Sequence, residues 1–577
     1  MIGLPASASQ TNWRVLPDQP EAQTRLQSEL GVSRVLAKLL VNRGITDPAE
    51  AEHFLNPSLD HLSDPTKLPD FEPALRAILG ARERKEKIYI HGDYDVDGVS
   101  STAILHRFLT KIDCNVVSHV PHREKEGYGI HSKAVHWATE AGAQLFLTCD
   151  CGSSAHNALE MVYEAGMKAV VTDHHEVQAT LPQAEAIVNP HRHDGPWPGI
   201  ELSGAGIAYQ LCHGICRGLG LPEAMFHKNF MDLAVLGTVA DVMPLHHDNR
   251  VITAFGLRSL RGTGKAGLKA LLKVAQLDDP TKPLTTRHIG FQLGPRLNAV
   301  GRIDDADVAL RLLLTNQDIE ATELAEFLDT TNQERRERQK RILDEATEEI
   351  RNKGLDEKYV IVVAKEGWEK GIVGIVAGKV VEAFRRPAFV LAIEGGKASG
   401  SARSIPNFHL ANAINLNRDI LASGGGHAAA AGCSLVVENI REFAHRLDQH
   451  AREFLTEEDF IPVTTIDAEA TLAEASLESL REISQLEPFG QANPEPVFLC
   501  RNLSILSLTP TRNPEHARVT LGSDGHTREA MAFGLGHQLG EMPRDAKIDV
   551  VFTLEESTWN GRTQFKWLIR DFQRSGS

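Results

Sequence analysis

The stretch IYIHGDYDVDG, residues 88–98, joins a short apolar run to several side chains that can bind a metal. The run Ile88–Ile90 consists of β-branched and aromatic residues, which predicts a buried β-strand. His91, Asp95 and Asp97 follow directly, where that strand would end. Polar residues at the carboxyl end of a strand are typical of α/β proteins that build a site there. The stretch therefore predicts an α/β sheet with a functional edge.

Three later stretches place further ligand-type residues after apolar runs. They are LFLTCDCG (145–152), AVVTDHH (169–175) and VADV (239–242), and they contribute Asp150, Asp173, His174, His175 and Asp241. We expect each of these stretches to be the end of a strand. Because the carboxyl ends of parallel strands converge on one crevice, we expect the side chains to meet in one pocket.

Carboxylate and imidazole groups suit Mn²⁺ or Mg²⁺ better than they suit a closed thiolate zinc site. Each residue also has a structural explanation, since an Asp after a strand often caps a helix or closes a turn. A lone pair of histidines is more often a surface or core feature than a ligand pair. The recurrence of such residues at successive strand ends favours a metal centre. We predict a hydrolytic centre with two metal ions.

Two cysteines flank Asp150 and raise the alternative of thiolate ligation. If residues 145–151 continue as a strand, both sulfurs point to the face opposite Asp150. We therefore interpret Cys149 and Cys151 as packing residues. The chain has seven cysteines, an odd number that does not suggest a disulfide framework.

The chain of 577 residues is too long for one hydrophobic core, so we expect about three or four structural units. Its formal net charge of −16 argues against a diffuse basic surface for nucleic acid, but not against a local groove. We find no apolar stretch near the roughly 18 residues of a membrane span, and no signal-peptide pattern at the N-terminus. We expect a cytoplasmic protein that does not enter a membrane.

Apolar periodicity divides the chain into segments and predicts an α/β fold with two lobes and a barrel. Residues 1–79 read as a lead-in with short helices, and 80–316 as alternating strands and helices of a parallel sheet. A long charged helix over 317–352 connects this lobe to a smaller α/β lobe over 353–460. Residues 461–577 show short separated β-runs, which fit a five-stranded barrel of the OB type. Such barrels bind single strands, although a purely structural cap is the alternative.

Four motifs resemble one known family. The motifs DYDVDG (93–98), DHH (173–175) and GGGH (424–427) resemble the DHH/DHHA1 phosphoesterases, and they occur in that family's order. The motif GPRLNAVGR (294–302) narrows the resemblance to the bacterial exonucleases specific for single strands. The resemblance runs from about residue 80 to the C-terminus and implies a DHH domain, a DHHA1 domain and an OB domain.

The resemblance also implies roles for individual residues. The metal ligands for two Mn²⁺ or Mg²⁺ ions would be His91, Asp95, Asp97, Asp150, His174 and Asp241. Asp150 would bridge the two ions, and Asp93 would be a less direct participant. Asp173 would orient an imidazole, and His175 would contact the scissile phosphate, so that the catalytic set is Asp150, Asp173, His174 and His175.

Substrate phosphates need hydrogen-bond donors. By resemblance these would be Arg123, Arg296, Arg302, Ser401, Arg403 and His427. The glycine-rich loop 424–432 suits a close approach of the backbone to a phosphate, although glycine runs also form ordinary flexible turns.

The activity implied is a metal-dependent 5′-to-3′ exonuclease that degrades single-stranded DNA to mononucleotides in recombination and repair. One alternative is a phosphodiesterase for oligoribonucleotides or cyclic dinucleotides, or a pyrophosphatase. Another is a non-catalytic scaffold of replication that binds single strands, which would bind DNA without metal-dependent release of nucleotide. The resemblance implies single-strand-binding protein and a RecQ-type helicase as partners, although we see no docking motif for either.

Overall fold

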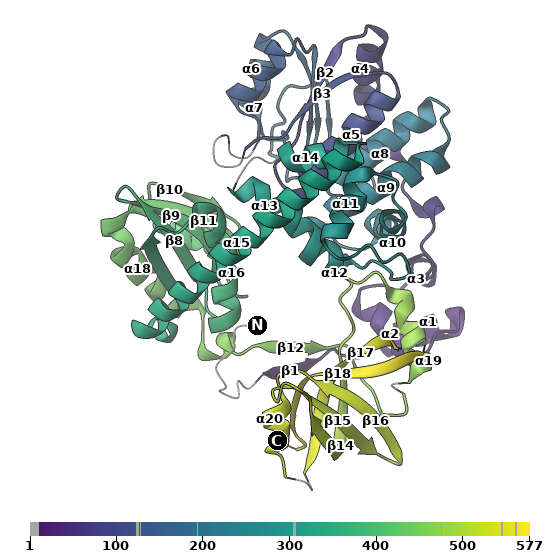
Figure 1. Cartoon of the computed structure of the whole chain (residues 1–577), viewed down its shortest axis with the longest axis vertical. Helices are drawn as coiled ribbons and strands as arrows, with labels where there is room; N and C mark the ends of the chain where they lie inside the picture. Colours follow the sequence, from purple (N-terminus) through teal and green to yellow (C-terminus); the bar gives the residue numbers. More distant parts are fainter. Residues whose placement is uncertain are drawn as a thin grey trace.

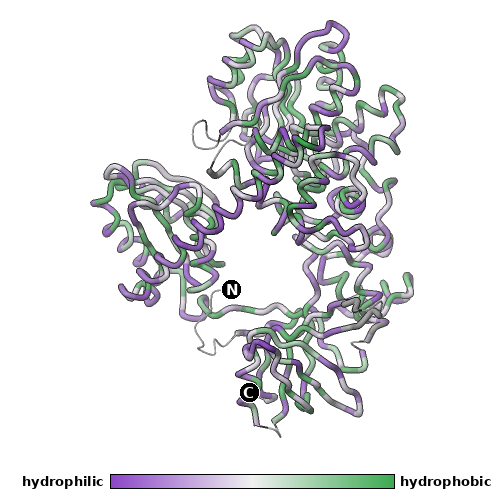
Figure 2. The backbone as a smooth tube through the Cα atoms, viewed as in Figure 1, coloured by the Kyte–Doolittle hydropathy of each residue, from purple (hydrophilic) through white to green (hydrophobic). Residues whose placement is uncertain are grey.

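The computed structural model describes residues 11–576 except 123–125, 127–128, 193, 304–306, 475, 544–545 and 560–561. Two α/β lobes and a β-barrel lie around a ring in projection, with one long helix running from the first lobe to the second (Figure 1). The predicted architecture of two α/β lobes, a connecting helix and an OB-type barrel is confirmed. Stretches of hydrophobic residues, drawn in green in Figure 2, occur in each of these parts. Within the described residues no helix is both long and apolar enough to cross a membrane.

The first lobe is built on a five-stranded parallel sheet with the order β3-β2-β4-β5-β6. Its strands are β2 (Lys87–His91), β3 (Asn115–His119), β4 (Leu145–Cys149), β5 (Lys168–Thr172) and β6 (Ala186–Val188). Helices α4 (Phe71–Glu83) and α5 (Val96–Lys111) contribute side chains to one buried hydrophobic cluster. Helices α6 (Ser132–Glu140) and α7 (His156–Glu164) contribute side chains to a second one. Alternate residues along each strand enter these two clusters, so the sheet is covered on both faces, as parallel sheets require.

After the sheet, the described residues of the first lobe form helices and no further strand. They are α8 (Gly204–Gly218), α9 (Glu223–Ala240), α10 (His247–Arg261), α11 (Ala266–Val274), α12 (Thr286–His288), the π-helix η3 (Ile289–Leu293), α13 (Gly294–Ile303) and α14 (Asp307–Leu314). The expected strand end at 239–242 is therefore wrong, and so is the expectation that the strand–helix alternation continues beyond the sheet. Residues 230–238 of helix α9 are all buried, and a helical segment buried on every side lacks the 3.6-residue apolar periodicity that distinguishes it from a strand.

Helix α15 (Asp318–Asn352) leads to the second lobe, as the charged sequence predicts. Its sheet has the order β10-β11-β9-β8-β7, in which only the pair β7–β8 is parallel. The strands are β7 (Ile361–Glu366), β8 (Ala388–Glu394), β9 (Lys397–Arg403), β10 (Ser423–Gly426) and β11 (Ala430–Val436), with helices α16 (Lys370–Phe384), α17 (Leu410–Asn415) and α18 (Ile440–Phe454). Helix α16 packs on β8 and β9 and also contacts α13 of the first lobe.

The C-terminal strands close into a barrel in which β14, β15, β16, β18 and β17 pair in turn and β17 returns to β14. These strands are β14 (Phe498–Pro510), β15 (Ala517–Ser523), β16 (His526–Ala532), β17 (Lys547–Trp559) and β18 (Arg562–Arg574), and α20 (Gly536–Gly540) lies between β16 and β17. Part of what the sequence predicts as short separated β-runs is the single 13-residue strand β14. A register shift between Cys500 and Leu503, with Asn502 at φ 58°, bends the strand there.

The N-terminal segment is not a separate lead-in. Strand β1 (Asn12–Val15) pairs in parallel with β12 (Val463–Ile466), which precedes the short strand β13 (Ala468–Glu469) and helix α19 (Leu477–Ile483). Helices α1 (Pro20–Leu30), α2 (Arg34–Asn42) and α3 (Pro48–Leu55) share one hydrophobic core with the barrel. In contrast, α4 belongs to the first lobe. Residues 11–83 are therefore divided between two parts of the molecule.

A buried arginine joins the first lobe to the barrel. Arg250 of α10 is 2% exposed, and its guanidinium donates to the carbonyl oxygens of Phe54, Gln485, Leu486 and Glu487. It also lies 3.6 Å from the centre of the Phe54 ring. One guanidinium thus holds α3 and the loop before β14 against α10.

Candidate metal centre

Four segments of the first lobe deliver the predicted ligands to one place. His91 ends β2, Asp95 precedes α5 and Asp97 lies in its first turn; Asp150 follows β4, His174 follows β5 and Asp241 follows α9. The parallel sheet brings β2, β4 and β5 side by side, so their carboxyl ends meet at one edge. Asp241 reaches the same place from a helix C-terminus.

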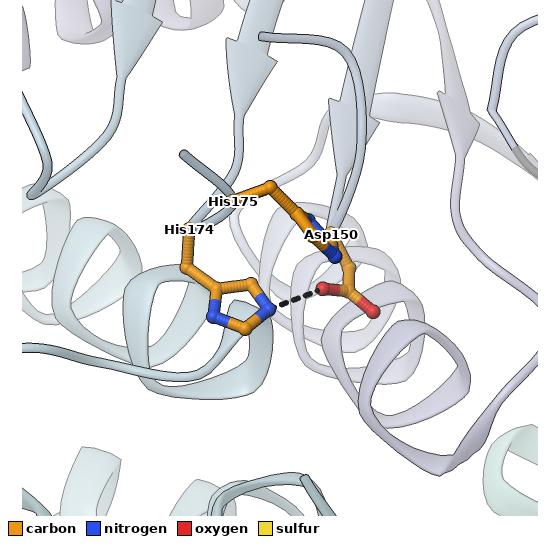
Figure 3. A group of neighbouring side chains, drawn as sticks. All are labelled: Asp150, His174 and His175. Carbon is orange, nitrogen blue, oxygen red and sulfur yellow. Dashed lines mark ion pairs between the residues drawn. The ribbon is translucent and has the colours of Figure 1, made fainter. Parts of the chain in front are cut away.

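His174 lies at the middle of the carboxylate group. Its Nε2 atom is 3.0 Å from Asp150 Oδ1, 3.6 Å from Asp241 Oδ2 and 3.8 Å from Asp97 Oδ2. The contact with Asp150 is drawn in Figure 3, where the two histidines approach the carboxylate from the strand beside it. Asp97, His174 and Asp241 each offer a ligand atom within 4.8 Å of the others. These three residues and Asp150 could hold one ion.

A second group of ligand atoms adjoins the first. Asp93, Asp95 and Asp150 offer carboxylate oxygens within 4.8 Å of one another, so Asp150 belongs to the surroundings of both His174 and Asp93. Asp93 was expected to have only an indirect role, and its place in this group was missed. His91 lies at the same strand end but in neither group; its Nε2 atom is 3.1 Å from the carbonyl oxygen of Gly129. Its Nδ1 atom is buried without a hydrogen bond among the described residues.

Helices α8 and α9 fix the position of Asp97. The backbone N–H groups of Gly204 and Ala205, in the first turn of α8, donate to its two carboxylate oxygens at 2.6 and 2.8 Å. A helix N-terminus stabilises an anion in this way. A Cβ atom at Gly204 would lie 2.7 Å from Asp150 Cβ, and one at Gly237 of α9 would overlap Asp97 Oδ1. Both helices approach the carboxylates closely only because these positions are glycine.

Asp150 leaves the strand in a left-handed conformation, with φ 62°. This turn breaks the alternation of side chains along β4. Cys149 enters the buried cluster on one face of the sheet, next to Thr102, and Cys151 enters the cluster on the other face. The expectation that both sulfurs point to one face is therefore wrong, whereas both cysteines are buried packing residues.

Asp173 organises the loop after β5. Its Oδ1 atom accepts hydrogen bonds from His174 N at 2.8 Å and from His175 N at 3.2 Å, and it lies 2.8 Å from His175 Nδ1. Its Oδ2 atom accepts from Ser153 N, which ties the loop to the segment after Asp150. Burial lowers the pKa of His175, but the hydrogen bond and charge of Asp173 outweigh it, so that pKa is raised. The His175 side chain is 48% exposed.

The electrostatics of the group favour the binding of cations. Burial raises the pKa values of Asp97 and Asp150 well above the usual carboxyl range, and neighbouring carboxylates add to the effect. Burial likewise raises the pKa of Asp241 to about 7. Burial lowers the pKa values of His91 and His174 to about 4, so these imidazoles are neutral and able to act as ligands. A divalent cation would relieve the repulsion among the carboxylates.

The donor set fits two hard divalent ions. It consists of carboxylate oxygens and imidazole nitrogens, and neither neighbouring thiol joins it, since Cys149 and Cys151 lie in the hydrophobic clusters. Asp150 Oδ1 is buried and, although it lies 3.0 Å from His174 Nε2, makes no hydrogen bond within the described part of the chain. An acceptor left in this state inside a protein needs a cation or a donor.

The second lobe holds three of the predicted phosphate contacts. Ser401 and Arg403 lie on β9, and His427 follows β10 on an exposed turn. An open pocket of about 550 Å³ is lined by Ser401 together with Lys370, Ser399, Ser423, Gly424 and Ser434. Lys370 and the serine hydroxyls beyond Ser401 were missed by the sequence analysis, because they come from α16 and from three strands.

The three remaining arginines are placed differently. Arg296 of α13 is 14% exposed and donates through Nε to Asp329 of α15 at 2.9 Å, so in this conformation it is engaged by a carboxylate. Arg123 lies outside the described residues. The backbone of Arg302 belongs to α13, but its side chain also lies outside the described part of the chain.

Comparison with family models gives three matches. The DHH family N-terminal domain matches residues 87–238, the DHHA1 domain matches residues 356–453, and the RecJ OB domain matches residues 466–571. The chain is 39% identical over 570 residues to the single-stranded-DNA-specific exonuclease RecJ of Bacillus subtilis (strain 168), covering 98% of this chain and 71% of that protein. It is 33% identical over 573 residues to the protein of that name from Dickeya dadantii (strain 3937), covering 96% of this chain and 97% of that protein.

Solved structures show the same similarity. The crystal structure of RecJ in complex with Mn²⁺ from Thermus thermophilus superposes with a TM-score of 0.83 at 28% identity, covering 99% of this chain and 81% of that chain. A crystal structure of exonuclease RecJ bound to manganese gives a TM-score of 0.60 at 32% identity, covering 69% of this chain and 97% of that chain.

Proposed function

Since this chain belongs to the RecJ family of single-stranded-DNA-specific exonucleases, we propose that it removes mononucleotides from the 5′ end of single-stranded DNA. It is a metal-dependent exonuclease, and a role in DNA recombination and repair is consistent with this activity. The 5′-to-3′ direction and the mononucleotide product are the parts that we add. The observation that carries the proposal of metal-dependent hydrolysis is that Asp150 shares one group of ligand atoms with Asp93 and Asp95 and also lies 3.0 Å from His174 Nε2.

We propose Asp97, Asp150, His174 and Asp241 as ligands of one ion. For the other ion we propose His91, Asp95 and Asp150, with Asp93 added from the geometry. Two such ions, when bound, activate a water molecule and neutralise charge on the attacking and leaving oxygens of a phosphodiester.

The protein's own groups would supply orientation and hydrogen bonds. Asp173 holds the Nδ1 atom of His175, so that the opposite edge of this half-exposed imidazole is presented to a scissile phosphate. The N–H groups of Gly204 and Ala205 hold the Asp97 carboxylate in one orientation. Fixed ligands of this kind lower the reorganisation needed during the reaction.

The second lobe would hold the phosphate of the strand end. Ser401 lines the open pocket, and Arg403 lies two residues further along β9. A Cβ atom at Gly374 of α16 would lie 3.1 Å from Ser401 Oγ and 3.8 Å from Arg403 Nη2, so both side chains approach this helix closely. A serine hydroxyl and a guanidinium are a suitable pair of donors for phosphate. We further propose phosphate contacts for His427, Arg296, Arg302 and Arg123, of which Arg296 would first have to leave Asp329.

We propose domains over 80–316, 353–460 and 461–577, with 317–352 as the connecting helix; the barrel core also takes in α1–α3. The barrel would bind the single strand. Single-strand-binding protein and a RecQ-type helicase are proposed as partners, because the enzyme needs exposed single strands, and the cytoplasm is the proposed location. Co-sedimentation of the purified proteins with and without DNA tests these partners.

The decisive experiment is a time course on single-stranded DNA labelled at either end, with Mn²⁺ or chelator, beside Asp150→Ala. Immediate release of labelled 5′-mononucleotide, absent with chelator and in the variant, is expected. Early release of the 3′ label would refute the direction. Intact DNA that still binds under every condition would instead favour a scaffold, and intact DNA without binding would favour small nucleotide substrates.

A further inference from the structure

A second cluster of ligand-type residues lies at the turn between α8 and α9. His213 comes from α8, Glu223 is the first residue of α9, and His227 lies one turn further along α9. One ligand atom from each residue lies within 4.8 Å of the other two. His213 is 2% exposed and His227 is 9% exposed. None of the three belongs to the carboxylate groups around Asp150.

The surroundings of His213 set its tautomer. The amide nitrogen of Gln210 donates to Asp248 Oδ2 at 2.5 Å, so the amide oxygen of Gln210 faces His213 Nδ1 at 3.4 Å. An amide oxygen only accepts, so this contact favours the tautomer of the neutral ring that has its proton on Nδ1. The unprotonated Nε2 atom then lies 2.7 Å from Glu223 Oε2, another acceptor. Two acceptors in contact need a cation or a further proton between them.

His227 is held in the same manner. Its Nδ1 atom is hydrogen-bonded to the hydroxyl of Tyr209, which is fully buried. The ring centres of His213 and His227 are 4.7 Å apart. A histidine that binds a metal through one nitrogen commonly has its other nitrogen fixed by a neighbouring polar group. Gln210 and Tyr209 provide such groups for the two rings.

Arg217 gives the ordinary explanation for Glu223, because it donates to the same Oε2 atom at 2.9 Å. That ion pair accounts for the carboxylate, but it does not account for two buried imidazoles whose ligand atoms lie within 4.8 Å of each other and of the carboxylate. Arg217 Nη1 also lies 3.6 Å from Asp64, which offsets part of its charge.

We propose that His213, Glu223 and His227 form a structural site for a zinc-type ion. Two imidazoles and one carboxylate suit Zn²⁺, which leaves a fourth position for water, and they suit Mn²⁺ or Mg²⁺ less well. The site would clamp α8 to α9 at the ends remote from the catalytic centre. The other ends of these helices hold Asp97 and carry Asp241. The ion would thus stabilise the helix pair that positions two catalytic carboxylates, while taking no part in hydrolysis.

The test uses full-length protein carrying Asp150→Ala and His174→Ala, so that the catalytic centre does not take up the probe. The protein is dialysed against micromolar free Zn²⁺, and bound zinc is measured by elemental analysis. Co²⁺ replaces Zn²⁺ in a parallel visible-absorption titration. The unsubstituted protein with excess Mg²⁺ repeats the comparison without those two substitutions.

We expect one zinc per chain, lost in both Glu223→Gln and His227→Gln. Glu223 is 40% exposed at its side chain, so the first variant should fold normally. Tyr209→Phe should weaken zinc binding by about 10- to 100-fold. The control is His136→Gln in α6, which removes an exposed histidine paired with Glu140 at 3.3 Å and outside the ligand clusters of the described residues, and it should bind zinc as the parent does.

Zinc should also raise the unfolding temperature of the parent but not that of Glu223→Gln. The proposal is overturned if the parent binds no zinc, if either ligand variant keeps it, or if zinc stabilises parent and Glu223→Gln equally. None of these outcomes depends on nuclease activity, so failure here leaves the exonuclease proposal untouched.

Discussion

Replacing Asp241 by Asn should stabilise the metal-free protein while abolishing its activity. Burial raises the pKa of this carboxyl to about 7, against an ordinary value of 3.8. Each unit corresponds to about 1.4 kcal/mol, so a shift of roughly three units is equivalent to up to about 4 kcal/mol against the folded state. The side chain is 30% exposed, and solvent screening reduces this value to about 2 kcal/mol.

The direction of the pH dependence follows from the sign of the shift. A carboxyl whose pKa is higher in the folded than in the unfolded protein disfavours folding fully above the folded value, and not at all below the unfolded value. The gain from Asp241→Asn should therefore be complete at pH 8. It should shrink as the pH falls through 7 and vanish near pH 4.

Thermal unfolding in chelator at pH 8 and pH 5 measures the effect. For a unit of 150 to 250 residues, 2 kcal/mol corresponds to a rise of roughly 4 to 8 °C in the transition of the first lobe. The control is Asp344→Asn, an exposed position on α15. If Asp241→Asn is less stable than the parent at pH 8, or equally stabilised at both pH values, the inferred cost of burying an ionised Asp241 is refuted.

Three other substitutions test separate parts of the molecule. Asp150→Ala should eliminate nucleotide release in Mn²⁺ and leave far-UV circular dichroism unchanged; residual normal activity would contradict its bridging role. Arg403→Ala should weaken binding of a 5′-phosphorylated strand about tenfold, equivalent to about 1.4 kcal/mol, as measured by a fluorescence-anisotropy titration. Binding of a 5′-hydroxyl strand should be weakened less. Equal losses of affinity for the two strands would place Arg403 outside the phosphate site. Arg250→Leu leaves buried carbonyls without a donor, which costs about 1–3 kcal/mol each, so the loop at 485–487 should become sensitive to limited proteolysis. An unchanged digestion pattern would show that this arginine does not hold the lobes together.

The sequence predicts best what depends on neighbouring residues. Strands β2, β4 and β5 each combine a short apolar run with a polar residue at the end, so both the sheet and its ligands are visible locally. The role of Asp97 was predicted, but its backbone donors at Gly204 and Ala205 lie more than a hundred residues away and have no local signal beyond the Ser203 helix cap.

Other features depend on contacts between distant segments. The left-handed turn at Asp150 reverses the side chains that follow, and a strand pattern assumes that no such turn occurs. Helix α9 was not recognised because its residues 230–238 are buried on every side, so that a short window of this part reads like a strand. The sequence of residues 1–79 predicts short helices. It does not predict which part of the molecule covers them.

The joining of the first helices to the last domain has a consequence for synthesis on the ribosome. Arg34 of α2 pairs with Glu474, and the two residues are 440 positions apart. At about 5–20 residues per second, α2 emerges roughly 20 to 90 seconds before its partner exists. During that interval the apolar faces of these helices lack the barrel core that later covers them. The core that α1–α3 share with the barrel can form only when strands β14–β18 have been made, so these helices are translated long before they reach their final place.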